Sequence, residues 1–223
     1  EASAAQAEGK FDVALPLYQR VLTLQPTHTV ALEQREDALS DVLQQASRAL
    51  AQGDLATGAR LIAQVRVYDA GHVELPDGEA QLGRAVEQRR QRADMELRRK
   101  RPEQALAGYR AVLEASPDDA AAKQGIERVA TAFAQRAARE ASDFDFTSAN
   151  ESLRQARELA PNASAVKEAT QSIARARQSQ SRLASALPPK ERARRVQALL
   201  VATAAAEARG DWLTPPGESA FDT

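Results

Sequence analysis

The chain has 223 residues, of which 43 % are hydrophobic and 27 % are charged, and its formal net charge is −1. This composition is typical of a folded chain, and the balanced charge gives no field that favours nucleic acid or an anionic membrane. The absence of cysteine excludes disulfides, thiolate chemistry and cysteine-ligated zinc. The sequence has no run of about 18 apolar residues, so we expect no direct membrane insertion of this segment.

One pattern of residues recurs along the chain. Its first copy consists of Gly9, Phe11, Ala14, Tyr18, Val21 and Pro26. Gly53, Lys100 and Phe144 begin the other copies, so successive copies start 44, 47 and 44 residues apart. The first position suits a tight turn, the next four form one stripe of a helix, and proline ends that helix. A small residue, such as Ala46, also recurs seven residues before each turn, where it lets two helices approach closely.

This pattern predicts long helices that alternate with short ones. In chain order, we expect helices over residues 28–52, 55–67, 77–99, 102–115, 118–142, 146–159, 163–186 and 190–209. The expected fold is all-α, with antiparallel helical hairpins stacked as a solenoid whose first helices are unusually long. We expect one array over residues 1–223, with hairpins at about 1–27, 28–70, 77–117, 118–161 and 163–223.

Residues 5–26 and 102–117 resemble the tetratricopeptide repeat. The resemblance implies antiparallel helix pairs in a right-handed superhelix with a concave binding groove. The copies are longer than the family's repeat of about 34 residues, and the extra length lies in the first helix of each pair. By the family's pattern, the groove-facing positions are Ser47, Arg90, Asp94 and Arg98.

Arg89 occupies a position that is apolar in three other hairpins, where Val42, Phe133 and Leu199 lie. We interpret Arg89 as a side chain that reaches the surface or pairs with a local carboxylate, or else lines the groove. The partner-binding candidates are therefore Ser47, Arg89, Arg90, Asp94 and Arg98.

Gly210 and Trp212 begin another copy of the pattern. We expect Trp212 to fill the core position that Phe11 occupies, the alternative being an exposed contact site. Neither end of the chain shows the polar capping that a repeat stack needs, which suggests that both ends are cuts in a longer polypeptide.

No catalytic motif is present, and we expect no enzyme activity, no cofactor and no metal site. The best metal candidate is the segment from Asp69 to Glu79, which contains His72; we interpret it instead as a loop in which Asp77 caps the next helix. Eight basic and three acidic residues lie between Arg84 and Arg101. They spread around the helix without aromatic neighbours, which favours a solvated helix over a nucleic-acid site.

These observations favour a helical-repeat scaffold or sensor module that binds another protein or peptide. The composition and the segment around Trp212 are similar to extracytoplasmic repeat regions of membrane-anchored bacterial proteins, including some with a serine/threonine kinase domain. That resemblance implies a periplasmic location, with the cytoplasm as the alternative. Two other functions stay open: a ligand- or glycan-recognising domain associated with an envelope enzyme, and a self-associating spacer that forms homo-oligomers.

Overall fold

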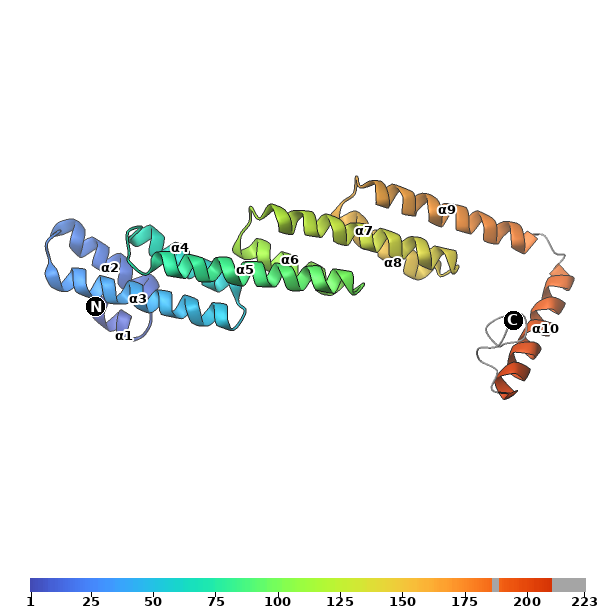
Figure 1. Ribbon diagram of the computed structural model, residues 1–223, viewed down its shortest axis with the longest axis horizontal. Coiled ribbons are helices and arrows are strands. Elements are labelled where there is room, and N and C mark those ends of the chain that lie inside the picture. The colour runs from blue at the N-terminus through green and yellow to red at the C-terminus, as the bar shows by residue number, and fades with distance from the viewer. Residues whose placement is uncertain (186–188, 210–223) are drawn as a thin grey trace. The chain divides into compact units, whose positions relative to one another are not determined.

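The computed structural model describes residues 1–185 and 189–209 (Figure 1). All regular secondary structure in these residues is helical, so the all-α prediction is confirmed. The chain divides into two compact units. Unit 1 comprises residues 1–133 and 155–163, and unit 2 comprises the described residues of 134–154 and from 164 onward. The single array over the whole chain stays a prediction.

Unit 1 is built from helical hairpins. Its helices are α1 (Ala2–Ala7), α2 (Phe11–Leu24), α3 (Thr29–Ala51), α4 (Leu55–Tyr68), α5 (Leu75–Arg98), α6 (Pro102–Ala115) and the first part of α7 (Ala120–Ser142). The pairs α1–α2, α3–α4 and α5–α6 pack as hairpins, while α3 also contacts α5 and α4 contacts α6. Between the second and third hairpins, the first helix therefore lies on the first helix and the second helix on the second, whereas the first hairpin packs on the second through α2 and α3.

The predicted helix ends agree with the structure to within about two residues. Each of the second helices α2 and α6 stops two residues before its proline, at Leu24 and Ala115. A residue that precedes proline is disfavoured in the α-helical conformation, which explains these ends. In the hairpin that has Ala70 in place of proline, α4 nevertheless ends at the equivalent residue, Tyr68.

The residues that begin each copy of the sequence pattern share one backbone conformation. Gly9, Gly53, Lys100 and Phe144 all have positive φ, with values of 70°, 84°, 60° and 59°. A left-handed residue of this kind reverses the chain after a helix and satisfies its last carbonyl groups. The turn positions were thus predicted correctly, although only the first two are occupied by glycine.

Replacing Lys100 by glycine should raise the free energy of unfolding by about 1 kcal/mol, because the left-handed conformation costs a non-glycine residue roughly 1–2 kcal/mol and glycine's greater freedom when unfolded offsets part of the gain. Thermal and urea denaturation measure the change. Gly53→Ala is the matched control and should destabilise, since the new Cβ would also lie 3.1 Å from Arg89 Nη2. An unchanged or lower stability of the Lys100→Gly protein would contradict the prediction.

Small residues set the distance between the helices of each hairpin. Ala46 and Ala93, on the first helices, are buried, and so are Ala14 and Ala105 on the second helices. At Gly108 of α6, an added Cβ would lie 2.8 Å from the Cβ of Ala93 on α5. The core between the helices is filled by larger apolar residues, among them Leu39, Val42, Ile62, Tyr109 and Phe133.

Unit 2 contains the rest of α7, the part of α8 (Phe146–Leu159) up to residue 154, α9 (Ser164–Ser185) and α10 (Pro189–Arg209). The Nε of Arg136 on α7 donates to the Oγ of Ser152, which is buried on α8 (3.0 Å). The Arg177 guanidinium lies 5.4 Å from the Phe146 ring centroid, and its Nη2 donates to Asn150 Oδ1 (3.2 Å). The two contacts of Arg177 join α9 to the start of α8, and the hydrogen bond of Arg136 joins α7 to α8.

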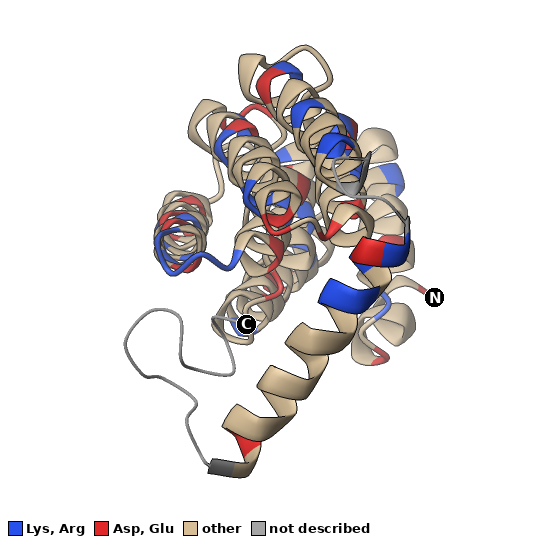
Figure 2. Ribbon diagram, turned by 90° about the vertical axis from the view of Figure 1, so that its right-hand side faces the viewer, with Lys and Arg blue, Asp and Glu red and all other residues tan. Residues whose placement is uncertain are grey.

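Helix α10 leaves apolar side chains in solvent. Lys and Arg residues gather in its first two turns, whereas its middle carries no charge (Figure 2). Val196, Leu199 and Leu200 are exposed there. The copy of the sequence pattern expected to begin at Gly210, with Trp212, lies outside the described residues.

The loop before α5 corrects one prediction. We expected Asp77 to cap this helix, but α5 begins at Leu75 and Asp77 lies within its first turn. The physical reason is Pro76, whose fixed φ and missing N–H suit the first turn of a helix, so the helix starts earlier. Glu74 takes the capping position without a side-chain hydrogen bond.

Candidate binding surface

A polar hollow lies between α3 and α5. Its volume is about 430 Å³, and Ser47 is one of the residues that line it. The others are Ser40, Asp41, Leu43, Gln44, Glu74, Asp77, Gly78 and Gln81. The hollow thus contains three carboxylates and no basic residue. Ser40 donates to Glu74 Oε1 (3.3 Å), whereas Asp41 and Asp77 make no ion pair within the described part of the chain.

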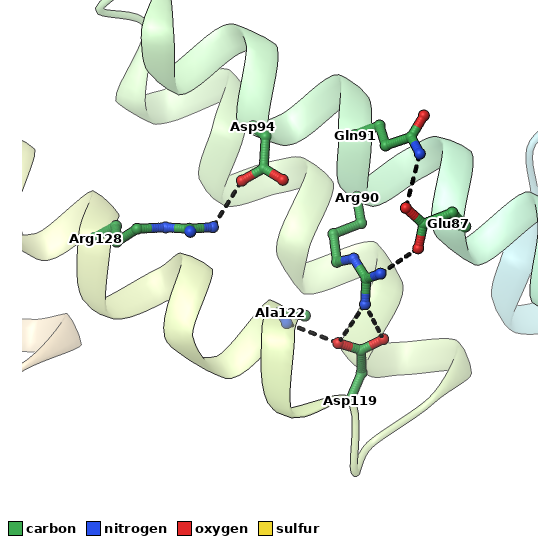
Figure 3. Close-up of polar contacts among 7 residues, drawn as sticks. All are labelled: Glu87, Arg90, Gln91, Asp94, Asp119, Ala122 and Arg128. Atoms are coloured by element: carbon green, nitrogen blue, oxygen red, sulfur yellow. Dashed lines mark hydrogen bonds and ion pairs between the residues drawn. The ribbon is translucent and has the colours of Figure 1, made fainter.

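Arg90 joins two successive first helices of unit 1. Its Nη1 lies 3.3 Å from Asp119 Oδ2, at the start of α7, and its Nη2 contacts the Glu87 carboxylate (Figure 3). Asp119 is itself positioned by the backbone N–H of Ala122, which donates to its Oδ1 (2.7 Å). Glu87 also accepts from Gln91 Nε2 (2.7 Å). Since each charge has an opposite partner, Arg90 holds α5 and α7 together.

Asp94 accepts the hydrogen bonds that form a second polar cluster. Its Oδ1 accepts from the hydroxyl of Tyr109 on α6 (2.5 Å) and from Arg128 Nη2 on α7 (2.6 Å; Figure 3 shows the pair with Arg128). The Tyr109 ring is fully buried. Burial, and next the hydrogen bond to Asp94, raise the pKa of the Tyr109 hydroxyl above 10.0, its ordinary value. Asp94 therefore connects three helices of unit 1.

The two remaining candidates, Arg89 and Arg98, differ in their burial and in their contacts. Arg89 is half-buried on α5, and its Nη2 donates to the backbone carbonyl of Gly53 (2.9 Å). It thus stabilises the turn between α3 and α4 from the neighbouring hairpin. Arg98 is exposed near the end of α5 and makes no ion pair with the described residues. Of the five predicted positions, Ser47 and Arg98 present free polar groups, and Arg89, Arg90 and Asp94 have partners within unit 1.

Part of the basic stretch of α5 and the following turn is paired locally. Besides Arg89 and Arg90, both Arg99 and Arg101 contact the carboxylate of Glu96, at 3.0 and 3.3 Å. These pairs favour the interpretation of a solvated helix over a continuous cationic surface.

Both histidine side chains accept a hydrogen bond from a backbone N–H at the start of a helix. His28 Nδ1 accepts from Ala31 N (3.1 Å) and caps α3. His72 is buried between hairpins; its Nδ1 accepts from Glu74 N (3.2 Å), and its Nε2 lies 3.4 Å from Glu36 Oε1. In the segment proposed above as a metal candidate, Asp69 is paired with Arg35 (2.9 Å). Within residues 1–185 and 189–209, no group of three or more potential ligands is placed to hold a metal ion.

The sequence analysis missed the partners of the candidate residues. Tyr109, Asp119 and Arg128 belong to the polar clusters, yet the pattern marked only Tyr109, as a core residue. One signal was available: a buried tyrosine hydroxyl needs a polar partner. Tyr18, at the equivalent position of the first hairpin, likewise donates to Gln6 on its own first helix (2.7 Å).

No model of a known protein family matches the chain, and no curated protein matches its sequence. Among the helices that the structure describes, none is both long and apolar enough to cross a membrane.

Proposed function

We propose that the chain is a non-enzymatic module that binds another protein, and that the hollow between α3 and α5 takes a basic segment of that partner. The observation that carries the proposal is the pair of uncompensated carboxylates, Asp41 and Asp77, beside Ser47 in a hollow of about 430 Å³. Complementary charge speeds encounter and selects among partners. A lysine or arginine side chain that enters the hollow would meet both carboxylates and the Ser47 hydroxyl.

Two further observations support a binding role over catalysis. The histidines hold backbone N–H groups at helix starts through Nδ1, and the charged groups around Arg90 and Asp94 are paired with one another. These clusters fix the spacing of α5 and α7, and thus keep the surface beside them rigid, which lowers the entropic cost of binding. The absence of cysteine is consistent with the periplasmic location that we also propose.

Binding to an array of immobilised random peptides tests the proposal. We expect the 223-residue chain to select peptides rich in lysine and arginine, and to lose them as salt is raised. The double variant Asp41→Asn with Asp77→Asn should lose the selected peptides. Asp12→Asn with Glu114→Gln is the matched control, because these two exposed carboxylates, one in a first helical turn like Asp77, lie outside the hollow. Equal retention by both double variants, or no selection at all, would refute the proposal.

A further inference from the structure

The exposed side of α5 carries a row of arginines without carboxylate partners. Arg84, Arg92 and Arg98 lie within about 60° of the line along the helix through Asp77, since successive helical residues turn by about 100°. These three arginines and Asp77 are all exposed. None of the arginines makes an ion pair with the residues that the structure describes. This arginine row therefore continues, on the same helix, from the hollow that Asp77 lines.

The carboxylates of α5 lie to the sides of this row, where other basic groups neutralise them. Each carboxylate that follows Asp77 along the helix is about 80° or more away from the line through Asp77. The ion pairs are Glu79 with Arg66, Glu87 with Arg90, Asp94 with Arg128 and Glu96 with Arg99. Figure 3 shows how the pairs of Glu87 and Asp94 turn toward α7. Positive charge is therefore left unbalanced on the exposed side of α5.

The side chains between the arginines suit an extended polypeptide. Gln88 and Gln91 are exposed there, and Met95 is 45 % exposed. Amide side chains both donate and accept hydrogen bonds, so they can bond the backbone of an extended segment. A helix satisfies its own backbone and packs through a broad apolar stripe, for which Met95 alone supplies too little surface. The surface thus favours an extended partner over a helical one.

We propose that the arginine row binds the acidic part of a partner segment whose basic residue occupies the hollow. Only the place of that basic residue rests on the proposed function. Along the helix axis, the three arginines lie about 10, 22 and 31 Å beyond Asp77. An extended chain advances about 3.3 Å per residue, so carboxylates about three, seven and nine residues from the basic residue face these arginines. The partner segment is therefore basic at one end and acidic beyond it.

A nucleic acid fits this surface less well than an acidic polypeptide. The arginines are spaced about 9–12 Å apart along the helix, so they form a broken row and not a continuous cationic track. At one end, Asp41 and Asp77 repel a chain that carries a phosphate on every unit. No aromatic side chain lies between Arg84 and Arg98 for a base to stack on. A segment with one basic end has complementary charge along the whole surface.

A labelled, otherwise uncharged peptide tests the inference, with one lysine and glutamates three, seven and nine residues after it. The reversed sequence is measured as well, because the row leaves the chain direction open, and the tighter binder is used. Fluorescence anisotropy at low salt should show saturable binding to the 223-residue chain, which weakens as salt is raised. The triple variant Arg84→Gln, Arg92→Gln and Arg98→Gln should bind about tenfold more weakly, because each exposed ion pair contributes a factor of about two.

The matched control is the triple variant Arg20→Gln, Arg60→Gln and Arg110→Gln. These three arginines are exposed on α2, α4 and α6, and their replacement removes the same net charge away from α5. Binding to this control should change by less than about twofold, because only long-range attraction is lost. Circular dichroism verifies that both triple variants fold.

A peptide with glutamine in place of its lysine separates the inference from the proposed function. Its glutamates still face the arginine row, so the protein with Asp41→Asn and Asp77→Asn should bind it at least as well as the native chain does. The variant that lacks the three α5 arginines should bind it more weakly than the control variant does. This result supports the acidic part of the inference even where the hollow takes no basic residue.

Four results would overturn the inference. The first is no saturable binding of the charged peptide, and the second is an equal loss of affinity in the two triple variants. The third is equal binding of a peptide of the same composition in which the lysine stands among the glutamates. The fourth is tighter binding of a single-stranded oligothymidylate of the same length, because the row then serves phosphates and not carboxylates.

Discussion

Gly108→Ala should lower the free energy of unfolding of unit 1 by about 1–3 kcal/mol, although alanine is the better helix former by about 1 kcal/mol. The new Cβ would lie 2.8 Å from the Cβ of Ala93 and 3.5 Å from its Cα. Ala93 has no side-chain torsion that could move its Cβ aside, so α5 and α6 must separate. Urea denaturation followed by circular dichroism measures the loss.

The same substitution at Gly83 is the control. Gly83 lies within α5, is exposed, and has no neighbouring atom within 4 Å of an added Cβ. Gly83→Ala should therefore stabilise the protein by about 0.5–1 kcal/mol through helix propensity alone. Combining Ala93→Gly with Gly108→Ala should restore part of the loss, since space returns at the contact. Equal effects at Gly83 and Gly108 would show that close packing does not decide the stability of this hairpin.

The sequence predicted the helices well because they repeat. Gly9 and Gly53 mark turns that need a positive φ, and the same spacing identified Lys100 and Phe144, which on their own do not look like turn residues. The proline that follows α2 and α6 gave the ends of these helices. Asp77 was assigned wrongly as a cap because a capping residue is defined by backbone conformation, and Pro76 moves the start of α5 upstream.

The contacts of the candidate binding residues were harder to predict from the sequence than the helices. The resemblance to the tetratricopeptide repeat marked Arg90 and Asp94 as groove-facing positions. Their partners, Asp119 and Arg128, lie at the start of α7 and within it, and depend on how that helix packs against α5. Arg89 illustrates the same limit. Its place in an otherwise apolar position signalled a special role, yet the acceptor is a backbone carbonyl at Gly53, which no side-chain pattern reveals.

Removing the carboxylate of Asp94 should destabilise unit 1 by about 1–3 kcal/mol, because it leaves the buried Tyr109 hydroxyl without its closest acceptor. Tyr109→Phe should cost about 1 kcal/mol, since the ring stays packed and Asp94 keeps Arg128. If the Asp94 carboxylate and the Tyr109 hydroxyl stabilise unit 1 through their mutual hydrogen bond, Asp94→Ala should lower the free energy of unfolding less in the Tyr109→Phe background than in the native chain. Strictly additive losses in this double-mutant cycle would argue against the coupling.

Alkaline pH provides an independent test of the same cluster. The pKa of Tyr109 is raised in the folded state, mainly by burial, so above about pH 10 the unfolded chain releases this proton while the folded chain retains it. The stability contributed by the protonated hydroxyl is complete below pH 10 and is lost as the pH rises through the folded-state pKa. Denaturation between pH 9 and 11 should show a steeper loss for the native chain than for Tyr109→Phe. Equal slopes for the native chain and the Tyr109→Phe protein would show that the loss does not arise at the Asp94 cluster.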